Sequence, residues 1–228
     1  MAESRSGMSS VSTTLLRNVP LLSVLSKDEL ALLARVVTRK SYARGNLILG
    51  AGDPTDSLYI LISGRIKVFM GDVDGKEVIL AILGPNEFFG EMGLIDNKPR
   101  SASVMALEAC ELVCISRLDF KRCLADNFDM AMTVMRGLVK RLREADNQIG
   151  SLALMDVFGR VARLLLGAAE IIDGEKVVTG KLSKQDIARM IGASREMVSR
   201  VMKHLQLAGY IEVRADSIVI RENNLLAD

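Results

Sequence analysis

The sequence predicts an α+β protein made of a β-barrel or jelly roll, a long helix and a C-terminal winged helix-turn-helix. Three observations predict it. Short β-rich runs fill residues 40–115, an apolar repeat with alternating steps of three and four residues follows, and two capped helices and a hairpin end the chain. We predict three parts, at residues 1–127, 128–156 and 157–228.

Composition describes an ordinary globular protein, with 49% hydrophobic and 25% charged residues and only 4 prolines. The net charge of +2 neither indicates nor excludes a nucleic-acid partner. Cys110, Cys114 and Cys123 cannot all pair and show no CxxC spacing, which favours reduced thiols. The first 14 residues lack the apolar core of a signal peptide, and no run reaches the ~18 apolar residues of a membrane span. These features predict a cytoplasmic protein without a membrane partner.

Local signals place the first elements. Residues 1–14 are rich in Ser and Thr and are expected to form a loose arm. A short helix should follow, with Ser26 as its N-cap and Glu29 at the capping-box position. The strand-like runs are residues 57–70, 77–83, 101–107 and 110–116.

A long helix is predicted from about residue 128 to 155. Its apolar seam is narrow, and no proline interrupts the stretch. The seam consists of Met135, Leu138, Leu142, Ala145, Ile149 and Leu152. The seam could simply pack on the protein's own barrel. The length and narrowness of the stripe favour dimerisation.

Two short helices then meet at a turn. Ser183 and Asp186 form a capping-box start, Gly192 lies at the turn, and Ser194 can cap the second helix. This pattern matches a helix-turn-helix, and residues 210–220 are predicted to form its wing.

The second helix has two distinct faces. One face carries the polar candidates for DNA contact, which with the cap are Ser194, Arg195, Glu196, Ser199, Arg200 and Lys203. The opposite, packing face carries Met197, Val198, Val201, Met202 and Leu205. Residues 176–206 hold seven Lys and Arg, Lys181 among them, against two acids. A solvated surface helix is the alternative, but the turn, cap, charge and hairpin together favour double-stranded DNA as partner.

The stretch FFGEMGLIDNKPRSASV, residues 88–104, contains a lone carboxylate in apolar surroundings. Burying Glu91 unpaired beside Phe88, Phe89 and Leu94 would cost several kcal/mol. We therefore expect a partner for Glu91.

The motifs GEMGL with PRSAS, NQIGSLALMDVFGRVARLL and SREMVSRVMKHLQ together resemble the cyclic-AMP receptor protein and fumarate-nitrate regulator (CRP/FNR) family of bacterial transcription factors. The resemblance covers nearly all of the chain after residue 20. It implies a cyclic-nucleotide pocket whose phosphate cassette is matched at Gly90, Glu91, Gly93, Leu94, Arg100, Ser101 and Ala102.

The chemistry of these residues agrees with that implication. Arg100 suits a cyclic phosphodiester, because a guanidinium donates two directed hydrogen bonds, and Ser101 can add another. Glu91 can accept from the ribose 2′-hydroxyl and orient Arg100, while backbone amides from Gly90 to Met92 can line the sugar's approach. The alternative is a structural Glu91–Arg100 pair that closes a loop.

The base-recognition end departs from the cyclic-AMP sensor. The resemblance puts Ala145 and Asp146 where that sensor has the Thr-Ser pair that contacts adenine. A methyl group cannot replace a hydroxyl, whereas a carboxylate suits the two adjacent donors of guanine. The expected effector is cyclic AMP, cyclic GMP or cyclic di-GMP. Asp146 could equally be a surface acid beside the seam.

Other functions find less support. The arm has no cysteine for an iron-sulfur cluster, and the only histidine, His204, lies on the helix expected to read DNA, which argues against haem. We expect no metal, and no catalytic triad or phosphate-binding loop of the GxxxxGK[ST] type occurs. An enzyme or kinase-regulatory subunit would need a catalytic domain where the helix-turn-helix stands. A ligand-independent DNA-binding regulator with a vestigial pocket is the second alternative.

The resemblance also implies how DNA is read. Arg195, Glu196 and Arg200 match the base-reading positions of the cyclic-AMP receptor protein, so a TGTGA-like half-site is expected. A homodimer formed through the 128–156 helix would bind two such half-sites, and RNA polymerase is the further partner expected of an activator.

Overall fold

The computed structural model describes residues 11–180 and 182–221. Most of the predicted arm, Lys181 and the last seven residues of the predicted DNA-binding part lie outside these ranges. The chain forms two compact units. The main division between them falls within the long helix α5 (Phe128–Leu154), after Leu142.

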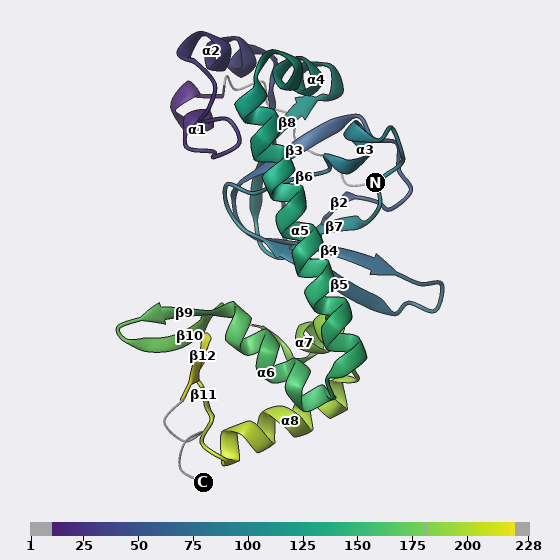
Figure 1. Cartoon of the computed structure of the whole chain (residues 1–228), viewed down its shortest axis with the longest axis vertical. Coiled ribbons are helices and arrows are strands. Elements are labelled where there is room, and N and C mark those ends of the chain that lie inside the picture. Colours follow the sequence, from purple (N-terminus) through teal and green to yellow (C-terminus); the bar gives the residue numbers. More distant parts are fainter. Residues whose placement is uncertain (1–10, 181, 222–228) are drawn as a thin grey trace. The chain divides into compact units, whose positions relative to one another are not determined.

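The first unit is built on a jelly roll of two four-stranded sheets (Figure 1). The first sheet has the order β1-β8-β3-β6, with strands Thr38–Tyr42, Cys110–Ser116, Ser57–Ser63 and Phe88–Phe89. The second has the order β2-β7-β4-β5, with strands Leu47–Leu49, Ser103–Ala106, Ile66–Gly71 and Glu77–Leu83. Within the described residues the two sheets are not hydrogen-bonded to each other. The α+β prediction is confirmed, in its jelly-roll form and not as a closed barrel.

Strand β8 shows why this part of the sequence is almost continuously apolar. Leu112 and Cys114 face the core between the two sheets, and Val113 and Ile115 face a second core. That second core lies against α1 (Thr13–Arg17), α2 (Lys27–Val36) and α4 (Arg117–Asp126), the helices grouped at one end of the jelly roll in Figure 1. A strand covered on both faces needs apolar residues at successive positions and not only at alternate ones.

The capping box predicted for α2 is confirmed. The Ser26 hydroxyl accepts from the backbone N–H of Glu29, and the Glu29 carboxylate accepts from the backbone N–H of Ser26 at 2.7 Å. These hydrogen bonds hold the pKa of Glu29 below its usual value. The helix therefore begins where the local sequence signal places it.

Helix α5 uses two of its faces differently. Met130 and Val134 are buried in the core beside the jelly roll, and Gly137 lies so close to Phe88 that a Cβ there would come within 2.9 Å of the ring. The chain itself covers little of the predicted seam. Leu138 is half-buried against the same core. The exposed seam side chains are Met135 at 45%, Leu142 at 62%, Ile149 at 64% and Leu152 at 54% exposure.

The second unit contains a helix-turn-helix and a small sheet. Its helices are α6 (Val157–Ala168), α7 (Lys184–Ile191) and α8 (Arg195–Leu207), which pack around a common apolar core. Its sheet has the order β11-β12-β10-β9, with strands Ile211–Val213, Ser217–Ile220, Glu175–Thr179 and Ala169–Ile172. The hairpin β11–β12 confirms the predicted wing.

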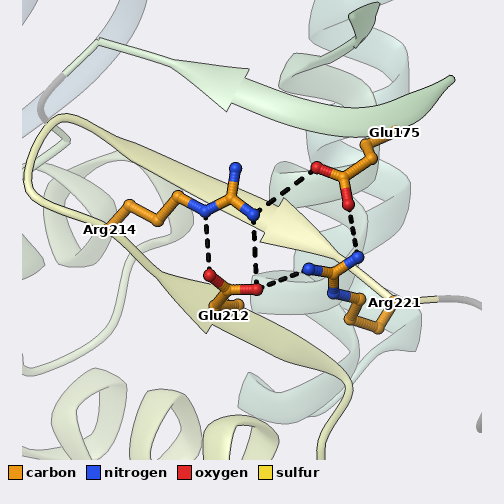
Figure 2. A network of polar contacts seen from close by, with 4 residues as sticks. All are labelled: Glu175, Glu212, Arg214 and Arg221. Atoms are coloured by element: carbon orange, nitrogen blue, oxygen red, sulfur yellow. Dashed lines mark hydrogen bonds and ion pairs between the residues drawn. The ribbon is translucent and has the colours of Figure 1, made fainter. Parts of the chain in front are cut away.

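A closed ring of four charged side chains joins three strands of this sheet (Figure 2). Arg214 contacts Glu212 at 2.8 Å and Glu175 at 3.5 Å, and Arg221 also contacts both carboxylates. The ring lies on the face of Val219, because Val219 is the register partner of Glu212 and opposite residues share a face. Val219 itself is fully buried.

Candidate functional site

The predicted cassette follows strand β6 and begins with a glycine that the structure requires. Gly90 has a φ of +82°, and a Cβ on it would lie 2.4 Å from Nη1 of Arg100. The left-handed backbone and the missing side chain therefore let Arg100 fit against the loop. Glu91 follows at the N-cap of the short helix α3 (Met92–Ile95) and is 1% exposed.

Glu91 has the partner that its burial demands, and the partner is Arg141 of α5. Nη1 of Arg141 lies 2.5 Å from Oε1 of Glu91, and Nη2 of Arg141 donates to the carbonyl of Phe88. The guanidinium also lies over the Phe88 ring, 5.2 Å from its centroid. The expectation that Glu91 would orient Arg100 is wrong, because the Glu91 carboxylate pairs with Arg141 and the hydrogen bonds of Arg100 go to Gly90, Ser57 and Asp56.

Arg100 is held instead by backbone carbonyls. Its Nη1 donates to Gly90 O at 2.8 Å and its Nη2 to Ser57 O at 2.8 Å, with Asp56 Oδ1 at 3.4 Å from Nη2. The guanidinium stands 5.7 Å from the centroid of the Tyr59 ring. Burial raises the pKa of the Tyr59 phenol, so this ring stays neutral beneath the cation.

Two polar atoms of the cassette remain unused. Oε2 of Glu91 and Nε of Arg100 are buried without a hydrogen-bond partner. Such groups are uncommon because leaving a donor or acceptor unpaired away from water costs about 1–3 kcal/mol. One is an acceptor on a carboxylate and the other a donor on a cation, so together they suit a ligand with a hydroxyl and an anionic oxygen.

Two further cassette residues, Ser101 and Gly93, have different surroundings. Ser101 is exposed, and its hydroxyl is 3.7 Å from the sulfur of the half-exposed Met92. Gly93 makes room for protein atoms, since a Cβ there would come within 2.4 Å of Thr55 Oγ1 and Lys98 O. Gly93 therefore has a packing role in the loop.

Ala145 and Asp146, predicted to face the base, are exposed on α5 in the second unit. Their part in binding stays a prediction. Sequence reasoning missed Arg141, although a signal was available. Arg141 precedes Ala145 by one helical turn, and residues four apart share a face of a helix.

The helix-turn-helix forms as its local signals predict. The Ser183 hydroxyl accepts from the N–H of Asp186, and the Ser194 hydroxyl accepts from the N–H of Met197. Gly192 ends α7 in the left-handed conformation, with a φ of +64°. Each cap satisfies a backbone group that a helix end leaves unpaired.

The predicted reading face of α8 is open to solvent. Arg195, Glu196, Arg200 and Lys203 are exposed, while Ser199 is half-buried and its hydroxyl accepts from Lys184 Nζ at 3.3 Å. On the packing face, Val198, Met202 and Leu205 are buried and Val201 is half-buried. Met197 was expected to pack, but it is 45% exposed. Its place in the first turn, beside the cap, leaves it at the edge of the core.

Among the described residues, no group of three or more His, Cys, Asp and Glu side chains could hold a metal ion. No described helix is both long and apolar enough to cross a membrane.

Cys110 and Cys114 are buried free thiols, and burial raises the pKa of Cys110.

Two protein-family models match the chain. The cyclic nucleotide-binding domain matches residues 39–127, and the Crp-like helix-turn-helix domain matches residues 159–228. The first match contains the Glu91–Arg100 cassette, and the second contains the exposed face of α8.

Named relatives extend these matches over most of the chain. It is 33% identical over 202 residues to the CRP-like cAMP-activated global transcriptional regulator of Mycobacterium tuberculosis, covering 87% of this chain and 90% of that protein. It is 35% identical over 189 residues to the cAMP-activated global transcriptional regulator Vfr of Pseudomonas aeruginosa, and the match covers 80% of this chain and 88% of that protein. Among solved structures, the c-di-GMP-responsive global regulator CLP of Xanthomonas campestris has a TM-score of 0.73 at 28% identity, and the match covers 86% of this chain and 99% of that chain.

Proposed function

The chain belongs to the CRP/FNR family of transcription regulators, a family of DNA-binding proteins and not of enzymes, and from that premise we propose a specific mode of control. We propose that a homodimer binds a palindromic DNA site under the control of a cyclic nucleotide in the Glu91–Arg100 pocket. In this proposal residues 1–127 sense the nucleotide, residues 128–156 form the dimer, and residues 157–228 bind DNA in the cytoplasm.

The pair of unused buried atoms carries the nucleotide part of the proposal. Nε of Arg100 can donate to a phosphate oxygen, and Oε2 of Glu91 can accept from the ribose 2′-hydroxyl. Arg141 holds the other carboxylate oxygen and so orients Glu91. Ser101, exposed beside Met92, can add a hydroxyl to the phosphate. A vestigial pocket would have no reason to keep two opposite charges buried and incompletely paired.

The effector is a cyclic nucleotide, and the residues of α5 bear on which base it carries. Relatives named as cAMP-activated favour cyclic AMP, whereas the c-di-GMP-responsive neighbour and Asp146 favour a guanine messenger. Ala145 shares a helix face with Arg141, which reaches the pocket, so the base should project toward that face.

Calorimetric titration with cyclic AMP, cyclic GMP and cyclic di-GMP tests the pocket. We expect one of them to bind and Arg100→Ala to abolish this binding. Asp146→Ala should lower the affinity for the guanine messengers more than the affinity for cyclic AMP. Arg122→Gln, at an exposed site on α4, is the control for the loss of a positive charge. If none of the three binds, the protein is the ligand-independent regulator.

The DNA part of the proposal rests on the exposed face of α8. Arginine donates two hydrogen bonds to guanine O6 and N7, and Glu196 can accept from a cytosine amino group. With Arg195, Glu196 and Arg200 on one open face, a TGTGA-like half-site is the proposed target. A dimer bound to two such half-sites would be placed to contact RNA polymerase.

Selection from random duplexes tests this target. We expect palindromes whose half-sites lie about one helical turn apart. Arg200→Ala should weaken DNA binding by ~1–3 kcal/mol and relax the base preference at one position of the half-site. Lys203→Ala should weaken the binding of all DNA sequences equally. Recovery of sites without two-fold symmetry would contradict the proposal.

A further inference from the structure

A cavity of about 200 Å³ lies within the second unit, to which Val78 at the start of β5 also belongs, and Val78 is one of its lining residues. The last turns of α5 contribute Asn147 and Ser151 to its wall, and α6 contributes Arg160 and Leu164. The end of α7 closes it at Gly192, where a Cβ would come within 3.2 Å of a Leu152 methyl group. It is smaller than the ~300–1,000 Å³ typical of sites for drug-sized ligands.

The polar wall of this cavity is positively charged. Arg160 donates from Nη1 to Ile191 O at 2.8 Å, while its Nε is buried without a partner. Arg163 donates from Nη2 to Asn147 Oδ1 at 3.0 Å. None of the described residues that line the cavity carries a carboxylate. Arg160 is half-buried and Arg163 is exposed, so two positive charges line the cavity and its wall holds no carboxylate to balance them. The buried, unpaired Nε of Arg160 is unfavourable for the empty protein.

The rest of the wall is apolar. Leu152, Leu164, Met190 and Ile191 line it together with the arginines. A free inorganic anion would satisfy the arginines but would leave this surface wet. An anion with a hydrocarbon body would satisfy both.

We propose that this cavity binds a small organic carboxylate, with the carboxylate on Arg160 and its hydrocarbon part against the apolar wall. The carboxylate accepts from the unused Nε, and Arg163 adds the second positive charge. The site is independent of the nucleotide pocket, since its charged residues come from α6 of the other unit.

Such a ligand would act on DNA binding through the elements that it contacts. Arg160 already fixes the carbonyl of Ile191, directly before the Gly192 turn of the helix-turn-helix. The same cavity contains residues of α5, the helix with the exposed apolar seam. A carboxylate seated there is therefore expected to change DNA affinity, to the extent that it favours one arrangement of these elements.

Calorimetry of the full chain with octanoate and benzoate tests the site, with octanol as the uncharged analogue and inorganic phosphate as the anion without hydrocarbon. We expect saturable binding of one or both carboxylates, one per chain, and none of octanol. Arg160→Met and Arg163→Gln should each weaken it at least tenfold. Arg163→Gln leaves the contact to Ile191 in place, so it remains informative if Arg160→Met disturbs the turn. Arg122→Gln should have no effect.

Two comparisons separate this cavity from the nucleotide pocket and from a site for any small anion. Arg100→Ala should keep carboxylate binding, and a loss there with retention in Arg160→Met would place the ligand in the nucleotide pocket and overturn the proposal. If phosphate bound as tightly as octanoate, the proposed role of the apolar wall would be overturned. If neither carboxylate bound saturably, the whole proposal would be overturned. In fluorescence anisotropy, octanoate should shift the DNA titration of the wild type and not that of Arg163→Gln.

Discussion

At the scale of single residues, the pocket depends on a cation that the loop cannot replace. Arg100 is 5% exposed and is fixed by the carbonyls of Gly90 and Ser57. Carbonyls lower the cost of burying the guanidinium but do not neutralise it, and the one carboxylate beside it, that of Asp56 at 3.4 Å, is 79% exposed and therefore screened by solvent. The charge therefore remains available to an anionic ligand, provided that Gly90 leaves room for it.

Replacement of Gly90 by alanine tests this dependence. A left-handed alanine costs about 1–2 kcal/mol, and the new methyl group would also displace Nη1 of Arg100. We expect the affinity for the cyclic nucleotide to fall at least about tenfold, which is about 1.4 kcal/mol, in a calorimetric titration. Gly45→Ala is the matched control, because Gly45 has a φ of +84° and its Cβ would meet nothing within 4 Å. Equal losses of affinity in both variants would contradict the role of Arg100.

The Glu91–Arg141 pair makes a second prediction at this scale. Arg141→Met leaves Glu91 buried without its partner, which should lower the free energy of unfolding by about 1–3 kcal/mol. Glu91→Gln in the same background should recover part of the loss, since a neutral amide needs no counter-charge. A double-mutant cycle by urea denaturation measures the coupling between the two residues. Independent effects of the two substitutions would argue against the pair.

The need for a partner at Glu91 could be predicted from the sequence, but the partner's identity could not. The prediction rested on the cost of a buried carboxylate, which is a property of one residue and its neighbours. Arg141 lies 50 residues further along the chain, and its approach depends on how α5 packs on the jelly roll. Arg100 was the nearer candidate in sequence, and it is held by backbone carbonyls instead.

At the scale of elements, some features of the second unit depend on neighbouring residues in the sequence and others depend on tertiary contacts. The caps at Ser183 and Ser194 and the glycine at 192 were predictable, because each involves residues within a few positions of one another. The charged ring was not predicted, since Glu175 meets Arg214 and Arg221 only after three strands have paired. Met197 shows the opposite error: the helical period assigned it to the packing face, but the core ends before it.

The ring predicts how the sheet responds to acid. Hydrogen bonds from Arg214 and Arg221 lower the pKa of Glu212 from 4.5 to about 2. A lowered pKa stabilises the folded state above pH 4.5, and this contribution disappears as the pH falls toward 2. The difference in melting temperature between the wild type and Glu212→Gln should therefore be constant above pH 5 and shrink below 4.5.

Salt gives a check on the same ring. Its four side chains are between 35% and 47% exposed, so added salt should reduce the difference between the wild type and Glu212→Gln. Glu170→Gln, a change of the same charge on the neighbouring strand β9, is the control. A difference that persists unchanged to pH 2 would show that Glu212 acts through packing and not through its charge.

At the scale of the whole molecule, α5 connects the two functions of the chain. Its first turns are buried beside the jelly roll, Arg141 reaches the cassette, and its last turns line the cavity beside the helix-turn-helix. The length of this helix and its seam could be predicted from the apolar period. The division of its faces could not, because the period does not say which apolar side chains the protein's own jelly roll will cover.

The exposed part of the seam predicts a dimer. Leu142 is 62% exposed and Ile149 is 64% exposed, and both lie on the stripe that a second copy of the helix would cover. Leu142→Asp would place a charge in that interface at a cost of several kcal/mol, so we expect monomers at micromolar concentration and weak binding to palindromic DNA. Leu32→Asp on α2 is the matched control, because Leu32 is also 62% exposed but lies outside the seam. Sedimentation measures the oligomeric state of both proteins. A wild type that is already monomeric, or a Leu142→Asp variant that stays dimeric, would show that the seam does not form the dimer interface.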